Sequence, residues 1–199
     1  QDKGAQTFGL DPAEEAVEHC QNVGINAKIS DFSTLNPFDQ KFDFVLFQNV
    51  LEHMSNPDIV IDNVFDNVLL DGGYLIIDVP NEFNSFQEAG QKTHDLPQWW
   101  VCPPGHLNYF TADSLTSLLT KKGFTIVDEI ASFPLEMFLL FGDKYVGDGE
   151  VGRQCHKKRM AFEKNLVEFG QKEAMLNFYR SFAQQNLGRQ TLIIAKKVK

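Results

Sequence analysis

Short apolar runs alternate along the chain with stretches in which apolar residues recur at helical spacing. The apolar runs have the length of β-strands and cover residues 6–10, 27–30, 42–47, 74–79, 124–130 and 190–196. Between them, apolar residues in 13–20, 60–68 and 115–119 recur three or four positions apart, which is typical of one face of a helix. This alternation predicts an α/β fold with a doubly wound, mostly parallel sheet and helices on both faces.

Capping residues predict where the helices begin and end. Asp11 and Pro12 open the first helix, Asn56 and Pro57 open the second, and Thr111 opens the third. The second helix is expected to end at the run 71–73, Asp-Gly-Gly. The run 42–47 is nearly all apolar, which indicates a strand buried on both faces.

Two long segments do not follow the alternating pattern. Residues 81–110 show no steady period, so we predict a long functional or mobile loop. Residues 134–187 are helical in pattern, with interruptions near 147–152 and 170. We therefore assign 1–133 and 188–199 to one sheet domain, and 134–187 to a helical insertion or lid before the last strand.

The composition excludes several classes of protein. Of 199 residues, 43% are hydrophobic and 18 are Phe, which is enough apolar side chain to exclude a disordered chain. Three scattered cysteines without a Cys-x-x-Cys pair exclude a disulfide scaffold and a zinc ribbon. No apolar run approaches the ~18 residues of a membrane span, and the first residues do not resemble a secretory signal. We expect a cytoplasmic protein without a membrane partner.

Charge is unevenly distributed along the chain. Residues 1–150 contain 7 basic and 24 acidic side chains, whereas 151–199 contain 11 basic and 3 acidic ones. The acidic body argues against nucleic acid as a partner, because phosphates would be repelled. The basic run 153–159 suits a phosphorylated or sugar-linked acceptor, although the same run is typical of a solvated helix face.

Polar residues follow several of the predicted strands, where α/β sheets bind ligands. Asp11 has the chemistry to accept hydrogen bonds from a ribose diol, and its alternative role is to cap the helix that follows. Asp31, after the next strand, has the chemistry to accept an adenine amine, and its alternative is an ordinary loop aspartate. Gln48, Asn49 and Asn81 follow the next two strands.

Several motifs together resemble those of class I S-adenosylmethionine-dependent methyltransferases. They are Gly-Leu-Asp-Pro at 9–12, Phe-Asp-Phe-Val-Leu-Phe-Gln-Asn-Val-Leu-Glu-His at 42–53, Leu-Leu-Asp-Gly-Gly-Tyr-Leu-Ile-Ile at 69–77, Val-Pro-Asn at 79–81 and Pro-Gly-His-Leu-Asn-Tyr-Phe-Thr at 104–111. The resemblance covers about residues 7–130, the last strand also fits, and the ubiquinone-type and sugar-cluster enzymes are most similar. It implies a Rossmann-like sheet and S-adenosylmethionine as cofactor.

Carried onto this sequence, the resemblance implies a role for each strand-end residue. Asp11 would bind the ribose, and Asp31 and Phe32 would lie at the adenine edge. Gln48 and Asn49 would lie beside the methionine part and the methyl group. The pair 52–53, Glu-His, would open the next helix, where capping and packing are the favoured roles.

The loop 81–110 contains the candidates for binding and activating the methyl acceptor. His106 is the predicted general base, because imidazole titrates near neutrality; its alternative is to hold the loop by hydrogen bonds. His94 is a weaker candidate for the same role. We predict acceptor contacts for Asn81 and for Trp99, Trp100 and Tyr109, whose rings would otherwise belong to the core. Cys102 and His106 alone do not make a zinc site, and no metal is predicted.

One feature of the resembled family is missing, because the sequence contains no Gly-x-Gly-x-Gly turn before the strand at 6–10. In the family, the strand preceding that turn lies between the strands matching 6–10 and 42–47. We therefore expect an upstream segment, direct pairing of these two strands, or a second copy of the chain to fill the gap, and weak cofactor binding by residues 1–199 alone.

The predicted function is methyl transfer from S-adenosylmethionine to an oxygen or carbon of a small molecule, such as a sugar or a quinone-like ring. The alternative is a truncated or degenerate, non-catalytic binding module with the same fold. A nicotinamide-dependent dehydrogenase is a third and weaker interpretation, since it would require its own glycine fingerprint after the first strand.

Overall fold

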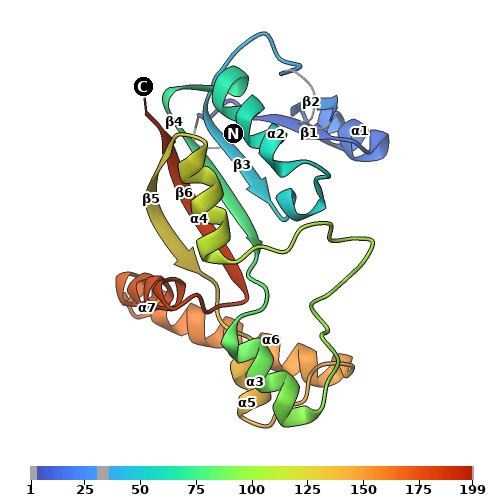
Figure 1. Ribbon diagram of the computed structural model, residues 1–199, viewed down its shortest axis with the longest axis vertical. Coiled ribbons are helices and arrows are strands. Elements are labelled where there is room, and N and C mark those ends of the chain that lie inside the picture. The colour runs from blue at the N-terminus through green and yellow to red at the C-terminus, as the bar shows by residue number, and fades with distance from the viewer. Residues whose placement is uncertain (1–3, 31–35, 199) are drawn as a thin grey trace.

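The computed structural model describes residues 4–30 and 36–198, and its strands and helices alternate as the sequence predicts (Figure 1). The strands are β1 (Phe8–Asp11), β2 (Asn26–Ile29), β3 (Phe42–Gln48), β4 (Leu69–Pro80), β5 (Phe124–Ala131) and β6 (Gln190–Lys197). The α-helices are α1 (Glu14–Asn22), α2 (Pro57–Asn63), α3 (Ser85–His94), α4 (Ala112–Lys121), α5 (Glu136–Leu140), α6 (Gly149–Glu168) and α7 (Lys172–Gln184). A 3₁₀ turn, η1 (Leu51–His53), and a π-helical turn, η2 (Val64–Val68), complete the set.

The strands form two separate sheets. A four-stranded sheet has the order β3-β4-β6-β5, and β1 pairs only with β2 in a second, parallel sheet. In the larger sheet β3 and β4 are parallel, whereas β6 is antiparallel to both of its neighbours. The predicted α/β class is confirmed, and the mostly parallel sheet is confirmed in part, because β6 alone among the four strands reverses and makes the larger sheet mixed. The reversal arises because the chain between β5 and β6 returns through α5–α7 to the same end of the sheet.

The main core lies on one face of the larger sheet. Val45, Leu75, Ile77 and Ile193 pack against the apolar sides of α2 and α4, and their neighbours along each strand alternate outward. The prediction that β3 is buried on both faces is therefore wrong. Phe44 and Leu46 are 63% and 59% exposed, although the Phe44 ring stacks on Tyr74.

The small sheet contacts the larger one through aromatic side chains at the start of β3. The Phe8 ring lies 5.2 Å from Phe38 and 5.1 Å from Phe42, each in an edge-to-face arrangement. No backbone ladder joins the two sheets within the described residues, so direct pairing of β1 with β3 does not fill the expected gap.

Helices α3, α5, α6 and α7 lie toward the end of the molecule farthest from β1 (Figure 1). A second apolar cluster joins Phe133 and Phe138 to Cys155 of α6 and Tyr179 of α7. The predicted loop 81–110 contains α3, whose capping box pairs Asn84 with Gln87. The Asn-x-x-Gln spacing is the signal that sequence reasoning missed, because α3 is too polar to show a clear apolar stripe.

Two predicted helix boundaries also differ from the structure. Asp11 caps the turn before α1 rather than the helix itself, which begins at Glu14. The second helix ends through the π-helical turn at Val68, and Asp71 to Gly73 belong to β4. By contrast, Thr111 caps α4 through Ser114, as predicted.

Among the described helices, none has both the length and the apolar content to cross a membrane.

Candidate functional site

The carboxyl end of β3 turns sharply into the candidate site. Asn49 has a left-handed backbone with φ 53°, and its amide donates to the Asp78 carbonyl of β4 at 2.8 Å. The Asn49 side-chain oxygen accepts a hydrogen bond from Gln190 of β6 at 2.7 Å. This turn leads directly into η1, where Leu51 and Glu52 are buried and His53 faces outward.

The segment 105–108 is held against η1 by several hydrogen bonds. The amides of Leu107 and Asn108 both donate to the Glu52 carbonyl, at 2.9 and 3.0 Å. The Asn108 side chain donates to the Met54 carbonyl at 2.6 Å. His53 Nδ1 lies 2.6 Å from the Gly105 carbonyl oxygen. These contacts place His106 beside residues that lie more than fifty positions earlier in the sequence.

Three titratable side chains meet at this point: Glu52, His53 and His106. One ligand atom from each lies within 4.8 Å of the other two. The His53 and His106 rings meet edge to face with centroids 5.1 Å apart. Burial raises the pKa of Glu52, although a hydrogen bond to its carboxylate and the charges of the two histidines oppose the shift. Burial and the Glu52 charge also raise the pKa of Asp78.

Aromatic side chains border the same cluster. The His106 ring lies 6.1 Å from Tyr109, whose hydroxyl accepts a hydrogen bond from the Cys102 amide. Phe83 joins Tyr109 to Trp100, and Trp99 packs edge-on against Trp100. Trp100 is only 1% exposed, whereas Trp99 and Tyr109 are half-buried. The structure thus brings His106 and the three predicted aromatic residues together, while contact with an acceptor stays a prediction.

The predicted cofactor residues stand at strand ends. Asp11 ends β1, is half-buried, and accepts a hydrogen bond from the Ala13 amide at 2.8 Å. Gln48 and Asn49 are exposed at the end of β3. The predictions for Asp31 and Phe32 fall outside the described residues.

Asn81 is fully buried, where its amide group donates to the backbone carbonyls of Asn186 and Gly188, both at 3.2 Å. The Asn81 side-chain oxygen has no partner among the described residues. His94 Nε2 donates a hydrogen bond to the Leu139 carbonyl oxygen at 2.7 Å, which joins α3 to α5. Both side chains therefore hold the loop and the helices around the site in place.

Sequence reasoning missed a buried carboxylate network behind the loop. Glu82 accepts hydrogen bonds from Gln87 at 2.7 Å and from Arg189 at 3.2 Å. Glu136 is fully buried without a described partner for either carboxylate oxygen, and burial raises its pKa. The Tyr145 pKa is raised by burial and by the Glu136 charge. No local sequence pattern indicates this network, because its members lie far apart along the chain.

The basic run 153–159 lies on α6, where its charges are largely matched by acidic neighbours. Arg153 pairs with Glu150 at 2.6 Å, and Lys158 pairs with Asp143 at 2.6 Å.

The basic run is preceded by Gly-Asp-Gly-Glu-Val-Gly at 147–152, which has the spacing of a dinucleotide-binding fingerprint. This glycine-containing segment follows a turn after α5 rather than a strand. The Asp148 carboxylate accepts hydrogen bonds from the amides of Glu150 and Val151. The context required for a dehydrogenase fingerprint is therefore not met.

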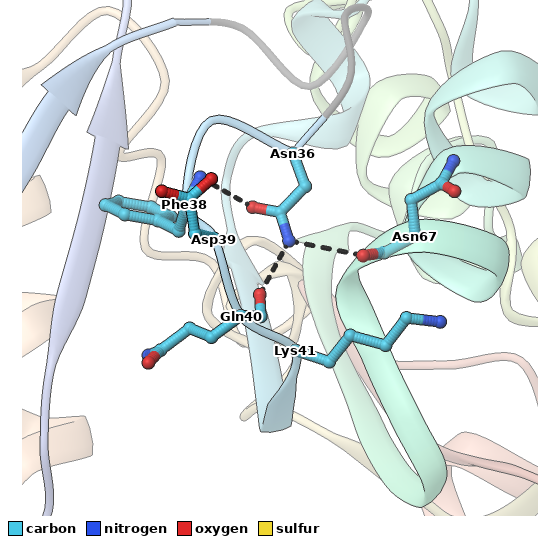
Figure 2. A pocket seen from close by; sticks show the side chains of 6 residues that line it. All are labelled: Asn36, Phe38, Asp39, Gln40, Lys41 and Asn67. Atoms are coloured by element: carbon cyan, nitrogen blue, oxygen red, sulfur yellow. Dashed lines mark hydrogen bonds between the residues drawn. The ribbon is translucent and has the colours of Figure 1, made fainter.

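A surface hollow of about 360 Å³ lies at the opposite end of β3 (Figure 2). Its centre is the Asn36 side chain, which donates to the carbonyls of Gln40 and Asn67 and accepts from the Phe38 amide. Because these polar groups form hydrogen bonds with one another, the hollow belongs to the loop that leads into β3. The polar cluster at the carboxyl end of β3 is the better candidate for a functional site.

Comparisons with known proteins identify solved structures that share this fold. Solved structures with the same fold include a SAM-dependent methyltransferase from Archaeoglobus fulgidus, with 16% identity, a TM-score of 0.58, and coverage of 98% of this chain and 78% of that one. The cyclase SpnF has 18% identity and a TM-score of 0.56, with 97% and 67% covered. The Burkholderia thailandensis 1,6-didemethyltoxoflavin-N1-methyltransferase, solved with S-adenosylhomocysteine, has 15% identity and a TM-score of 0.52, with 100% and 64% covered.

No curated protein sequence matches the chain. A family model described as "Methyltransferase domain" matches residues 1–129, which include the strand-end residues and the whole cluster around His106. The chain therefore belongs to this family of methyltransferase domains.

Proposed function

We propose that the protein transfers a methyl group from S-adenosylmethionine to an oxygen or carbon of a small molecule. One observation carries the proposal: within the matched domain, Asp11, Asn49 and His106 stand at or beside the carboxyl ends of parallel strands. That edge is where open α/β sheets bind their ligands.

The residues at this edge fit the proposed cofactor. Asp11 offers a half-buried carboxylate, of which one oxygen is oriented by the Ala13 amide. A carboxylate held in this way is suited to accept hydrogen bonds from a ribose diol. Gln48 and Asn49 offer exposed amides at the end of β3. Asp11 would hold the ribose, and the two amides would hold the methionine part.

Methyl transfer requires mainly that the acceptor is positioned against the methyl group and that it loses a proton. When bound, S-adenosylmethionine supplies a methyl group on a positively charged sulfur. His106 would accept the proton of an acceptor hydroxyl on its ring nitrogen, and Glu52 would stabilise the resulting imidazolium. Trp99 and Tyr109 would limit the access of water to the acceptor.

The proposed acceptor is a sugar-linked or quinone-like small molecule, as in the ubiquinone-type and sugar-cluster enzymes that the motifs resemble. The presence of a small-heterocycle methyltransferase among the structural neighbours supports an acceptor of this size. Arg153 and its basic neighbours on α6 would suit an anionic group on the acceptor, and the site of action would be the cytoplasm.

A second function is favoured by one specific observation. The structural neighbour SpnF is a cyclase, so the fold by itself does not fix methyl transfer as the activity. The alternative is a non-catalytic binding module, with a small molecule or a second copy of this chain as its partner.

Turnover and cofactor binding measured on the same variant separate these functions. In the full-length gene product, His106→Ala should lower methyl transfer at least about 100-fold, the usual size of general-base catalysis, while cofactor affinity stays nearly unchanged. Transfer of radiolabelled methyl groups to a panel of phenols and sugars, together with calorimetry, measures both. No transfer by the unaltered protein to any acceptor would favour the binding module.

A further inference from the structure

The cluster of Glu52, His53 and His106 has a property that methyl transfer does not require. Its two imidazoles and one carboxylate converge, with one ligand atom of each within 4.8 Å of the others. They come from two segments of the chain, η1 and the loop before α4. We propose that these three side chains bind one divalent transition-metal ion.

Two atoms of the cluster are buried without a hydrogen-bond partner. Glu52 is only 2% exposed, yet its Oε2 contacts no donor among the described residues. His106 Nδ1 is also buried, and no described group bonds to it. A carboxylate oxygen or a ring nitrogen left unpaired in the interior is costly. A cation between them would satisfy both atoms at once.

The His53 ring is oriented as a metal ligand would be. Its Nδ1 lies 2.6 Å from the Gly105 carbonyl oxygen, which can only accept, so Nδ1 donates the proton. In the neutral ring, Nε2 then carries the lone pair, and it lies 3.7 Å from Glu52 Oε1. Metal-bound histidines are commonly fixed through the second nitrogen in this way. Without a cation, a lone pair would face a carboxylate oxygen.

The backbone around the ligands is fixed before any ion binds. The Leu107 and Asn108 amides, which directly follow His106, both donate to the Glu52 carbonyl. Nitrogen and oxygen ligands lie about 2.0–2.2 Å from zinc, which puts neighbouring ligand atoms about 3–3.5 Å apart. The side chains must therefore close by about 1 Å when the ion binds.

The ligand set indicates the class of metal. Two imidazoles and one carboxylate suit zinc, manganese or iron, whereas magnesium and calcium prefer oxygen ligands alone. The competing explanation is an ion pair between a doubly protonated His53 and Glu52, which needs no metal. The ion pair would leave Glu52 Oε2 and His106 Nδ1 unpartnered, and the metal site would not.

The site itself does not depend on the proposed function, but it changes what His106 does there. A ring nitrogen that holds a metal has no lone pair left for a proton. If the protein is a methyltransferase, the metal rather than His106 would then activate the acceptor, because a hydroxyl bound to a cation loses its proton more readily.

The experiment measures metal binding with no cofactor or acceptor present, so its outcome is separate from that of methyl transfer. The metal-stripped protein is titrated with Zn²⁺ and Mn²⁺ by calorimetry, and Co²⁺ is used as a visible-absorption probe of the ligand geometry. The variants are Glu52→Gln, His53→Gln and His106→Gln. His19→Gln, an exposed position on α1, is the matched control.

We expect one equivalent of metal, with affinity reduced at least 10-fold in each ligand variant and unchanged in the control. Circular dichroism checks that each variant is folded. His53 is 46% exposed, so His53→Gln keeps the test valid even if the buried variants unfold. Binding below one equivalent, or equal affinity in His53→Gln and the control, would overturn the metal site.

Discussion

The carboxylate of Asp11 uses one oxygen for the backbone, because Oδ1 accepts a hydrogen bond from the Ala13 amide at 2.8 Å. This contact orients the group at the end of β1 without burying it. The same side chain thereby stabilises the turn into α1 and presents an acceptor at the edge where a ribose would bind. Its two roles are compatible, and they respond differently to substitution.

Asp11→Ala should weaken S-adenosylmethionine binding in the full-length gene product by roughly 1.5–3 kcal/mol, the usual value for a charged hydrogen-bond acceptor. Calorimetry measures the affinity. Glu18→Ala, at an exposed position on α1, is the control and should leave it unchanged. Equal affinities in the two variants would contradict the ribose role.

Gly188 has a left-handed backbone with φ 108° and no room for a side chain. An added Cβ would lie 2.6 Å from the Ala131 Cβ and 2.8 Å from the Ser132 carbonyl oxygen. Gly188→Ala should lower the free energy of unfolding by about 2–4 kcal/mol, which combines backbone strain with overpacking. Gly147 also has a positive φ but nothing within 4 Å, so Gly147→Ala should cost only the strain. Urea unfolding of both variants makes the comparison, and equal losses would refute the steric account.

Helix α7 is attached to the edge strand β5 by a paired charge. The Arg180 guanidinium donates to both Asp128 carboxylate oxygens, at 2.8 to 3.2 Å, and these hydrogen bonds hold the pKa of Asp128 below its ordinary value. Arg180 also pairs with Glu173, but that carboxylate is 76% exposed. The element therefore depends more on the half-buried carboxylate than on the exposed one.

Asp128→Asn should lower the melting temperature more than Glu173→Gln does. Because the folded pKa of Asp128 is depressed, its contribution to stability is present above the ordinary pKa of 3.8. The contribution is lost as the pH falls through the lower, folded value. Melting curves recorded from pH 7 down to pH 2 should therefore show the gap between Asp128→Asn and the unaltered protein closing below about pH 4. A gap that stays constant down to pH 2 would show that the charge is not the cause.

At the scale of the whole molecule, the larger sheet is covered unevenly. Its core face packs against α2 and α4, whereas β3 leaves Phe44 and Leu46 largely exposed next to an edge without a described partner strand. Exposed apolar edges of this kind promote association between chains.

The 199-residue chain should therefore self-associate as its concentration rises, and the double change Phe44→Ser with Leu46→Ser should reduce this. Light scattering measures the association. Because both side chains are exposed, the double variant should keep the stability of the unaltered chain, whereas Val45→Ser, at a buried position between them, should lose about 2 kcal/mol or more. Unchanged scattering in the double variant would show that β3 is not the associating surface.

The sequence determined the order of strands and helices and the family, because local apolar periodicity, capping residues and short motifs are written in consecutive residues. The strand 42–47, the cap at Thr111 and the polar residues at the strand ends were all predictable for this reason. Even the α3 start at Asn84 had a readable Asn-x-x-Gln signal.

Tertiary structure alone decided which faces are buried and which distant side chains meet. β3 looks like a central strand in sequence, but burial depends on what packs against it, so Phe44 and Leu46 remain exposed. Glu52 and His53 look like helix-opening residues until the loop 105–108 folds back and places His106 against them. Both results depend on contacts between segments that lie far apart along the chain. A local sequence pattern does not specify which distant segments meet.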